Sequence, residues 1–231
     1  MEQLSGAVCD LAAEVVSVLT GGDHRPVAGS AAMGGDETVG VAAVRVLGAD
    51  VLLPSTIFRR AAAQPDLDLV LAAVRAYPPG PGASVSTAWS HWAMTHTLRQ
   101  VAGKNAPTWP DAVSAETEEP DASWLSTASW QELTHQLAVL GALAVPAASS
   151  RVAVEASRRP VDISRGFVRA VRRRDWLQAA GAARWLAVTG GVPDSLGLDA
   201  GLEFVLHMGG ADPRVALHAH AAQLMLAGGE R

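Results

Sequence analysis

The sequence contains a single cysteine, Cys9, among its 231 residues. One cysteine cannot build an internal disulfide framework, and it excludes every zinc site that needs two or more cysteine ligands. Cys9 lies close to Val8 and Leu11, a setting typical of a small buried apolar residue rather than of a reactive thiol. We therefore expect the fold to be stabilised by an apolar core, for which a chain of this length is sufficient.

Long hydrophobic runs are also scarce. A run such as Ala138–Ala148 is much shorter than the roughly 18 apolar residues that a membrane-spanning helix needs. The first residues include Glu2 and Asp10 and no basic segment, unlike a secretory signal. Hydrophobic residues make up 49% and charged residues 18% of the chain, which excludes the composition of a disordered protein. We expect a folded cytoplasmic protein that does not cross a membrane.

Short motifs with a known chemistry are absent. The sequence has no phosphate-binding loop, no nucleophile elbow and no zinc-protease motif. Glycine pairs such as Gly190-Gly191 lack the preceding strand and following helix that would cradle a phosphate group. No cofactor is predicted. Because catalytic residues can be scattered along a sequence, these absences favour a non-catalytic protein but leave an enzyme open.

The local signals that are present predict an all-α or α-dominated fold. Glu2–Leu19 repeats apolar residues every three or four positions, as expected for a helix with one buried face. Further along the chain, short polar side chains mark helix starts and the intervening turns are short, which predicts antiparallel helical hairpins in the C-terminal half. The four starts are Ser129 (with Glu132 completing a capping box), Asp162, Asp175 and Asp212 (before Pro213).

One segment in the N-terminal half suggests β-structure. Thr38–Leu47 is rich in valine, and Gly48-Ala49-Asp50 could turn it into Val51–Leu53. The adjacent residues Ala42 and Ala43 suit a helix equally well. We predict at most one small β-hairpin, within residues 38–53.

The distribution of prolines and charges predicts three regions. Residues 1–103 form a mostly helical N-terminal region, 104–123 an acidic, proline-containing linker or long loop, and 124–231 a helical C-terminal region. Residues 1–148 contain 15 acidic and 7 basic side chains, a net charge of −8, whereas residues 149–231 contain 8 and 11, a net charge of +3. The two halves therefore present different surfaces.

The strongest local feature is an arginine-rich helix. Between Arg151 and Arg184 there are 9 arginines and 3 acidic residues, a local charge of +6. Four of the arginines fall on one helical face and form the predicted binding site: Arg165, Arg169, Arg172 and Arg173. The alternative without a function is a solvated helix face, since the whole protein is biased toward arginine, with 17 arginines and one lysine. Such a face could also pair with the acidic linker of the same chain.

Histidines supply a second candidate site. Glu203 and His207 lie four residues apart on one predicted helix, and His218 lies on the next, so an antiparallel hairpin could bring three metal ligands together. Ordinary polar pairs between the helices explain the same pattern, and we favour them. A third candidate is aromatic. Trp89, Trp92 and His96 could line a ligand pocket, but such a cluster is more typical of a buried core, and we favour the core.

These observations favour a non-catalytic interaction protein, an adaptor or accessory subunit, that binds an acidic or helical protein partner through its basic helix face. An enzyme or enzyme subunit with His and Glu on facing helices, with or without a metal, is the first alternative. A nucleic-acid-associated protein is the second, and it is disfavoured because the chain carries a net charge of −5. The oligomeric state is left open.

Overall fold

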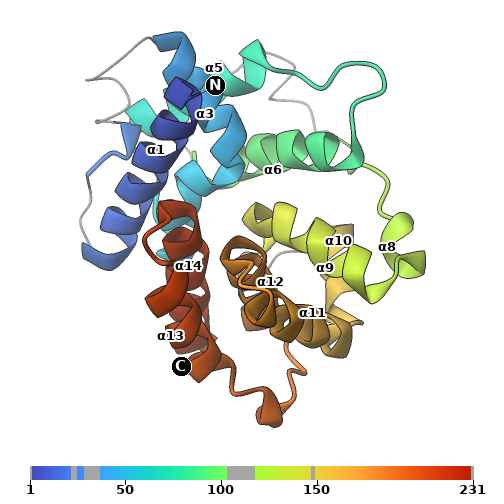
Figure 1. Cartoon of the computed structure of the whole chain (residues 1–231). Coiled ribbons are helices and arrows are strands. Elements are labelled where there is room, and N and C mark those ends of the chain that lie inside the picture. Colours follow the sequence, from blue (N-terminus) through green and yellow to red (C-terminus); the bar gives the residue numbers. More distant parts are fainter. Residues whose placement is uncertain (1, 22–24, 29–36, 103–117, 147–148, 230–231) are drawn as a thin grey trace. The chain divides into compact units, whose positions relative to one another are not determined.

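The computed structural model describes residues 2–21, 25–28, 37–102, 118–146 and 149–229. Throughout these ranges the regular structure is helical and no β-strand occurs, which confirms the predicted all-α class. The chain divides into two compact units, 1–120 and 121–231 (Figure 1). Most of the predicted linker 104–123, namely residues 104–117, lies outside the described residues.

The N-terminal unit packs its helices around apolar faces of the predicted kind. Its first helix buries Val8, Leu11, Val15 and Leu19, which confirms the periodicity seen in the sequence, and it packs against the second described helix. The elements of this unit are α1 (Glu2–Gly21), α3 (Glu37–Leu47), the 3-10 helix η1 (Gly48–Leu52), α4 (Leu53–Ile57), α5 (Gln64–Ala76) and α6 (Val85–Val101).

The β-hairpin predicted within residues 38–53 is wrong, because this segment is helical from α3 through η1 to the start of α4. The buried side chains explain the difference. Ala43 and Val44 are buried in α3 while Val46 is exposed, so burial follows the helical period and not the alternation of a strand. The valines suggested a strand, but packing of this face against α1 and α5 decides the structure.

The tryptophan-rich helix α6 belongs to the core of the N-terminal unit. Trp89 is fully buried, and its ring meets that of Trp92 edge to face, with centroids 5.3 Å apart. Trp92 also stacks on His96 at 4.5 Å. The burial of both tryptophans confirms the core interpretation over the ligand-pocket one.

The C-terminal unit is built around one largely buried helix. Helix α12 (Trp176–Thr189) packs against α9, α11, α13 and α14 (Figure 1), and its residues 179–186 are all buried. Small residues permit this close packing: a side chain at Gly181 would lie 2.9 Å from the backbone of Ala138. The other elements are α8 (Trp124–Thr127), α9 (Trp130–Val139), η3 (Gly141–Leu143), α10 (Arg151–Ser157), α11 (Pro160–Arg172), η4 (Asp194–Leu196), α13 (Leu198–Gly209) and α14 (Pro213–Gly229).

Helix starts in this unit follow the sequence signals with one exception. Ser129 and Glu132 form the predicted capping box, and the Asp175 carboxylate accepts a hydrogen bond from the backbone of Gln178. Asp162 does not cap its helix, because α11 begins earlier, at Pro160. Proline at the first helical position needs no partner for a backbone N–H, which accounts for the earlier start.

Two helical segments of the described chain, Glu2–Gly21 and Glu37–Ile57, are long and apolar enough to cross a membrane. Core helices of soluble proteins meet the same criteria of length and composition. Both segments contribute buried residues to the N-terminal unit, such as Val15 and Val44.

Candidate functional site

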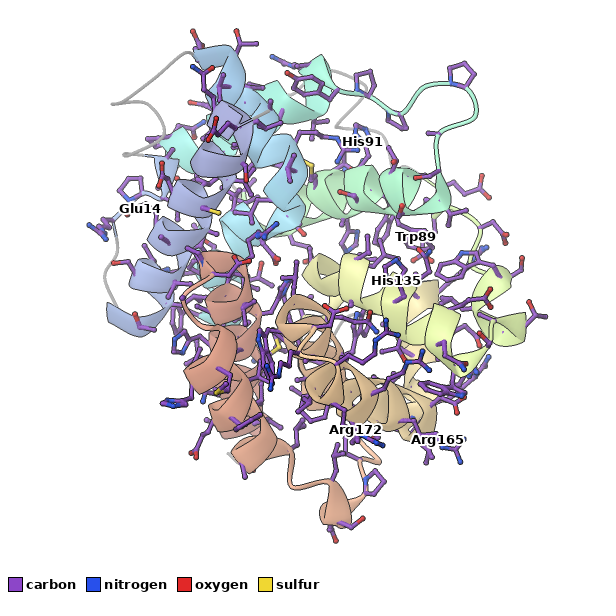
Figure 2. All side chains as sticks on the ribbon, in the orientation of Figure 1. Glu14, Trp89, His91, His135, Arg165 and Arg172 are labelled. Carbon is purple, nitrogen blue, oxygen red and sulfur yellow. The ribbon has the colours of Figure 1, made fainter. Side chains whose placement is uncertain are left out.

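The four predicted arginines lie together in the structure and line a groove of about 700 Å³ on the C-terminal unit. All four are exposed, and Figure 2 labels Arg165 and Arg172 along the same helix. No carboxylate lines this groove among the described residues. We call it the arginine groove; it is lined by Arg165, Arg169, Arg172 and Arg173 together with Trp130, Val161, Ser164 and Val168.

Helix α11 presents this surface because its opposite face is committed to the core. Ile163, Phe167 and Ala170 are buried, and their spacing of three or four residues fixes the rotation of the helix. The remaining arc carries Val161, 50% exposed, and Val168, 43% exposed, between the arginines. The groove is therefore both basic and apolar.

Helix α9 supplies the aromatic wall of the groove through Trp130. The capping box of Ser129 and Glu132 fixes the first turn of α9, so that Trp130 stands at its first helical position. The Arg169 guanidinium lies 5.5 Å from the centroid of the Trp130 ring, within the range of a cation–π interaction. The contact with Trp130 therefore holds Arg169, one of the four arginines, in place.

A glycine sets the distance between α9 and α11. A Cβ atom added at Gly166 would lie 2.0 Å from Oγ1 of Thr134, so the two helices touch at a point where no side chain fits. Thr134 is buried and donates a hydrogen bond from Oγ1 to the backbone oxygen of Trp130. The contact therefore connects the α11 backbone to the turn that carries Trp130.

A further arginine, Arg159, fixes the beginning of α11. Its guanidinium donates to the backbone oxygens of Leu125 and Ala128 at 2.9 and 2.8 Å, and to the Asp162 carboxylate at 2.7 Å. Arg165 approaches the other oxygen of Asp162 at 3.5 Å. Asp162 lies outside the lining of the groove and is engaged by Arg159, with Arg165 as a more distant partner.

The close spacing of the arginines carries an electrostatic cost. Arg165 and Arg169, like Arg169 and Arg173, are four residues apart, and like charges at this spacing destabilise a helix by a few tenths of a kcal/mol per pair. The partial negative charge at the C-terminal end of α11 offsets part of this cost for the last arginines. Neither Arg172 nor Arg173 forms an ion pair with another described residue.

The histidine and glutamate candidates are placed differently. Glu203 and His207 are exposed on α13, whereas His218 is half-buried on α14 and bonded to Arg184. Within the described ranges, no three His, Cys, Asp or Glu side chains form a group that could hold a metal. Arg214, on the same helix as His218, forms an ion pair with Asp212, and its side-chain hydrogen bond is the main cause that lowers the pKa of Asp212.

A second, smaller cavity of about 190 Å³ lies in the N-terminal unit. Its polar lining includes Asp66, Arg25, Arg60 and Ser55. Burial raises the pKa of Asp66, while hydrogen bonds from backbone N–H groups, including that of Ala28 at 2.7 Å, act in the opposite direction. These bonds tie residues 27–28 to α5, so a structural role accounts for Asp66.

Sequence reasoning found the arginines of the groove and missed its apolar part. Val161 and Val168 are seven residues apart, two turns of a helix, which is a signal present in the sequence. Trp130 has no such signal, because only the packing of α9 on α11 brings it to the groove. No protein-family model, curated protein or solved structure matches the chain. The geometry of the groove therefore carries the functional argument.

Proposed function

We propose that the chain is a non-catalytic interaction protein, an adaptor or accessory subunit, that binds an acidic segment of a protein partner in the arginine groove. One observation carries the proposal: four exposed arginines converge on a groove that no described carboxylate lines. A negatively charged partner would relieve the repulsion between these arginines. We place the protein in the cytoplasm as part of the same proposal.

The apolar part of the groove favours a protein partner over nucleic acid. Val161, Val168 and Trp130 offer contacts that a phosphate backbone does not use, and nucleic-acid affinity depends mainly on phosphate neutralisation over a broad basic surface. The proposal includes the predicted antiparallel arrangement of the C-terminal helices. Helix α11 packs on α12, and an antiparallel pair would hold the groove as a rigid, preformed surface.

The proposal is tested with a fluorescein-labelled acidic peptide, measured by fluorescence anisotropy against the full chain. The Arg165→Glu/Arg172→Glu variant reverses two charges of the groove, and we expect it to weaken binding at least about tenfold. The Arg59→Glu/Arg75→Glu variant, with two exposed arginines of the N-terminal unit replaced, changes the net charge equally and should bind like the native protein.

Binding should also weaken as salt rises from about 0.05 to 0.5 M, since exposed charges are screened. Equal loss of binding in the groove variant and in the control variant would show a general charge effect and contradict the proposal. A duplex DNA probe that binds more tightly than the peptide, with the same dependence on Arg165 and Arg172, would overturn it in favour of nucleic acid.

A further inference from the structure

The centre of the arginine groove is a straight apolar and basic stripe along α11. At 100° per residue, Val161, Arg165, Val168 and Arg172 fall within about 60° of one another around the helix axis. Val161 and Val168 are separated by about 10 Å along the axis, and Arg165 and Arg172 by the same distance. The two pairs alternate, so each exposed valine is followed one turn later by an arginine.

This repeat of seven residues matches the seam by which one helix packs on another. In such a seam, apolar residues of two helices interdigitate every seven residues while charged residues flank them and select the partner. Ser164, small and buried, lies between the two valines and leaves room for an inserted side chain. The residues of α11 therefore offer two apolar contacts and two cationic flanks at matching intervals.

Backbone hydrogen bonding favours a helix over an extended segment as the occupant of the groove. The α11 surface offers side chains only, because its backbone N–H and C=O groups are bonded within the helix. An extended peptide lying over Val161 and Val168 would bury backbone polar groups without partners, which is costly. A helix satisfies its own backbone and can place apolar side chains on the valines.

We infer that the arginine groove receives an amphipathic, acidic α-helix of a partner protein, with apolar residues seven apart facing Val161 and Val168 and carboxylates facing Arg165 and Arg172. This inference rests on the proposed function and specifies the partner. Trp130 forms one wall against which an apolar side chain of the incoming helix packs. Arg169, already over the Trp130 ring, closes that side of the groove.

The probe is a synthetic peptide of about 20 residues with leucines at the two seam positions, glutamates beside them and lactam bridges on its outer face to hold the helix. A second peptide has the same length and net charge, but two residues of its outer face are replaced by proline, which prevents the helix. Binding of both to the full chain is measured by isothermal titration calorimetry. We expect the helical peptide to bind at least about tenfold more tightly, since an extended chain cannot satisfy its backbone here.

Two variants locate the contact. Val161→Asp/Val168→Asp places carboxylates in the seam, at positions already exposed in the free protein, and should abolish preference for the helical peptide while circular dichroism stays unchanged. Val46→Asp/Val139→Asp, which replaces exposed valines outside the groove, should bind like the native chain.

The outcomes distinguish the two levels of the proposal. Equal binding of both peptides, with dependence on Arg165 and Arg172 but not on the valines, would overturn the helical occupant and leave an acidic segment as partner. Absence of binding by either peptide, or binding unaffected by Arg165→Glu/Arg172→Glu, would overturn both. Preferential binding to vesicles of anionic lipid, lost in the valine variant, would replace the partner helix by a membrane surface.

Discussion

Nη1 of Arg184 lies 3.1 Å from Nδ1 of His218, inside the C-terminal unit. Arg184 is fully buried and also donates from Nε to the backbone oxygen of Ala144 at 3.0 Å. A guanidinium has donors only, so Nδ1 of His218 must be the acceptor and its ring proton must sit on Nε2. This contact joins α12 to α14 and gives the histidine a structural role in place of the metal-ligand role considered from the sequence.

Replacing His218 by alanine should destabilise the C-terminal unit. The change removes one acceptor from a buried charged group, which costs about 1.5–3 kcal/mol of unfolding free energy. His218→Asn, whose amide oxygen can take the place of Nδ1, should lose less. Urea denaturation at neutral pH, followed by circular dichroism, measures both, and equal losses for the two variants would contradict the assignment of Nδ1 as acceptor.

Alanine substitutions at Gly166, in the contact between α9 and α11, and at Gly6, in α1, should have opposite effects on stability. Gly166→Ala places a methyl group 2.0 Å from Oγ1 of Thr134 and 2.5 Å from its Cβ, so it should cost about 1–3 kcal/mol. Removing the hydroxyl with Thr134→Ala cannot fully restore stability, because the Cβ contact remains. Gly6→Ala, exposed within α1 with nothing within 4 Å, should instead stabilise by up to about 1 kcal/mol.

If Gly166→Ala proved neutral, α9 and α11 would be free to separate and the wall formed by Trp130 would not be fixed. Thermal unfolding of both glycine variants tests this point. The Gly166→Ala variant should also bind the acidic peptide less well than the Gly6→Ala variant, since Trp130 would move with α9.

The N-terminal unit should lose stability on mild acidification. Burial and, to a smaller extent, the charge of Arg45 lower the pKa of His91 below its ordinary value of 6.5. Protonation is therefore easier in the unfolded chain, so the stability contributed by neutral His91 is present above pH 6.5 and is lost as the pH falls below it. Nδ1 of His91 is buried and has no hydrogen-bond partner among the described residues, consistent with a neutral ring.

The measurement compares native and His91→Asn proteins in urea between about pH 7.5 and 5.5, followed by tryptophan fluorescence. The variant should show a shallower loss of stability on acidification, although His96, whose pKa is also lowered mainly by burial, keeps part of the dependence. Parallel pH profiles for the two proteins would show that His91 does not titrate differently on folding.

Sequence reasoning succeeded where the signal was local and failed where packing decided. The capping box of Ser129 and Glu132 and the arginine face are patterns within a few residues, and both were visible. The valines of residues 38–53 suggested a strand because valine is common in strands. The helical period of this segment becomes clear only from the burial of Ala43 and Val44 in the structure. The aromatic wall of the groove could not be predicted. Trp130 meets Arg169 of α11 only because the two helices pack together, and the two residues are more than 30 positions apart in the sequence.

Arg174, which follows the C-cap of helix α11, is a residue that glycine should replace favourably. Arg174 has φ +58°, in the left-handed region, and the backbone N–H of Asp175 bonds to the oxygen of Ala170 as in a glycine-terminated helix end. A non-glycine residue pays about 1 kcal/mol for this conformation, so Arg174→Gly should raise stability by about that amount. Arg174 does not line the groove, and peptide binding should be unchanged. A lower melting temperature would mean that the Arg174 side chain contributes more than its backbone costs.

The arginines of the groove should contribute to binding and not to stability. Arg169 and Arg172 are exposed, form no ion pair with another described residue and repel the neighbouring arginines. The variant Arg169→Gln/Arg172→Gln should therefore leave the unfolding free energy within about 0.5 kcal/mol of the native value or raise it slightly. Loss of the Arg169 contact with Trp130, which spans 5.5 Å, limits any gain.

If these arginines instead paired with acidic residues of the same chain, the substitution would lower stability and increase proteolysis of the segment 104–123. Chemical denaturation, limited proteolysis and peptide titration on the same two proteins separate the possibilities. Unchanged stability with lost peptide binding supports a recognition surface. Unchanged stability with unchanged binding would reduce the arginine groove to a solvated helix face, because four converging charges would then have no consequence for either folding or association.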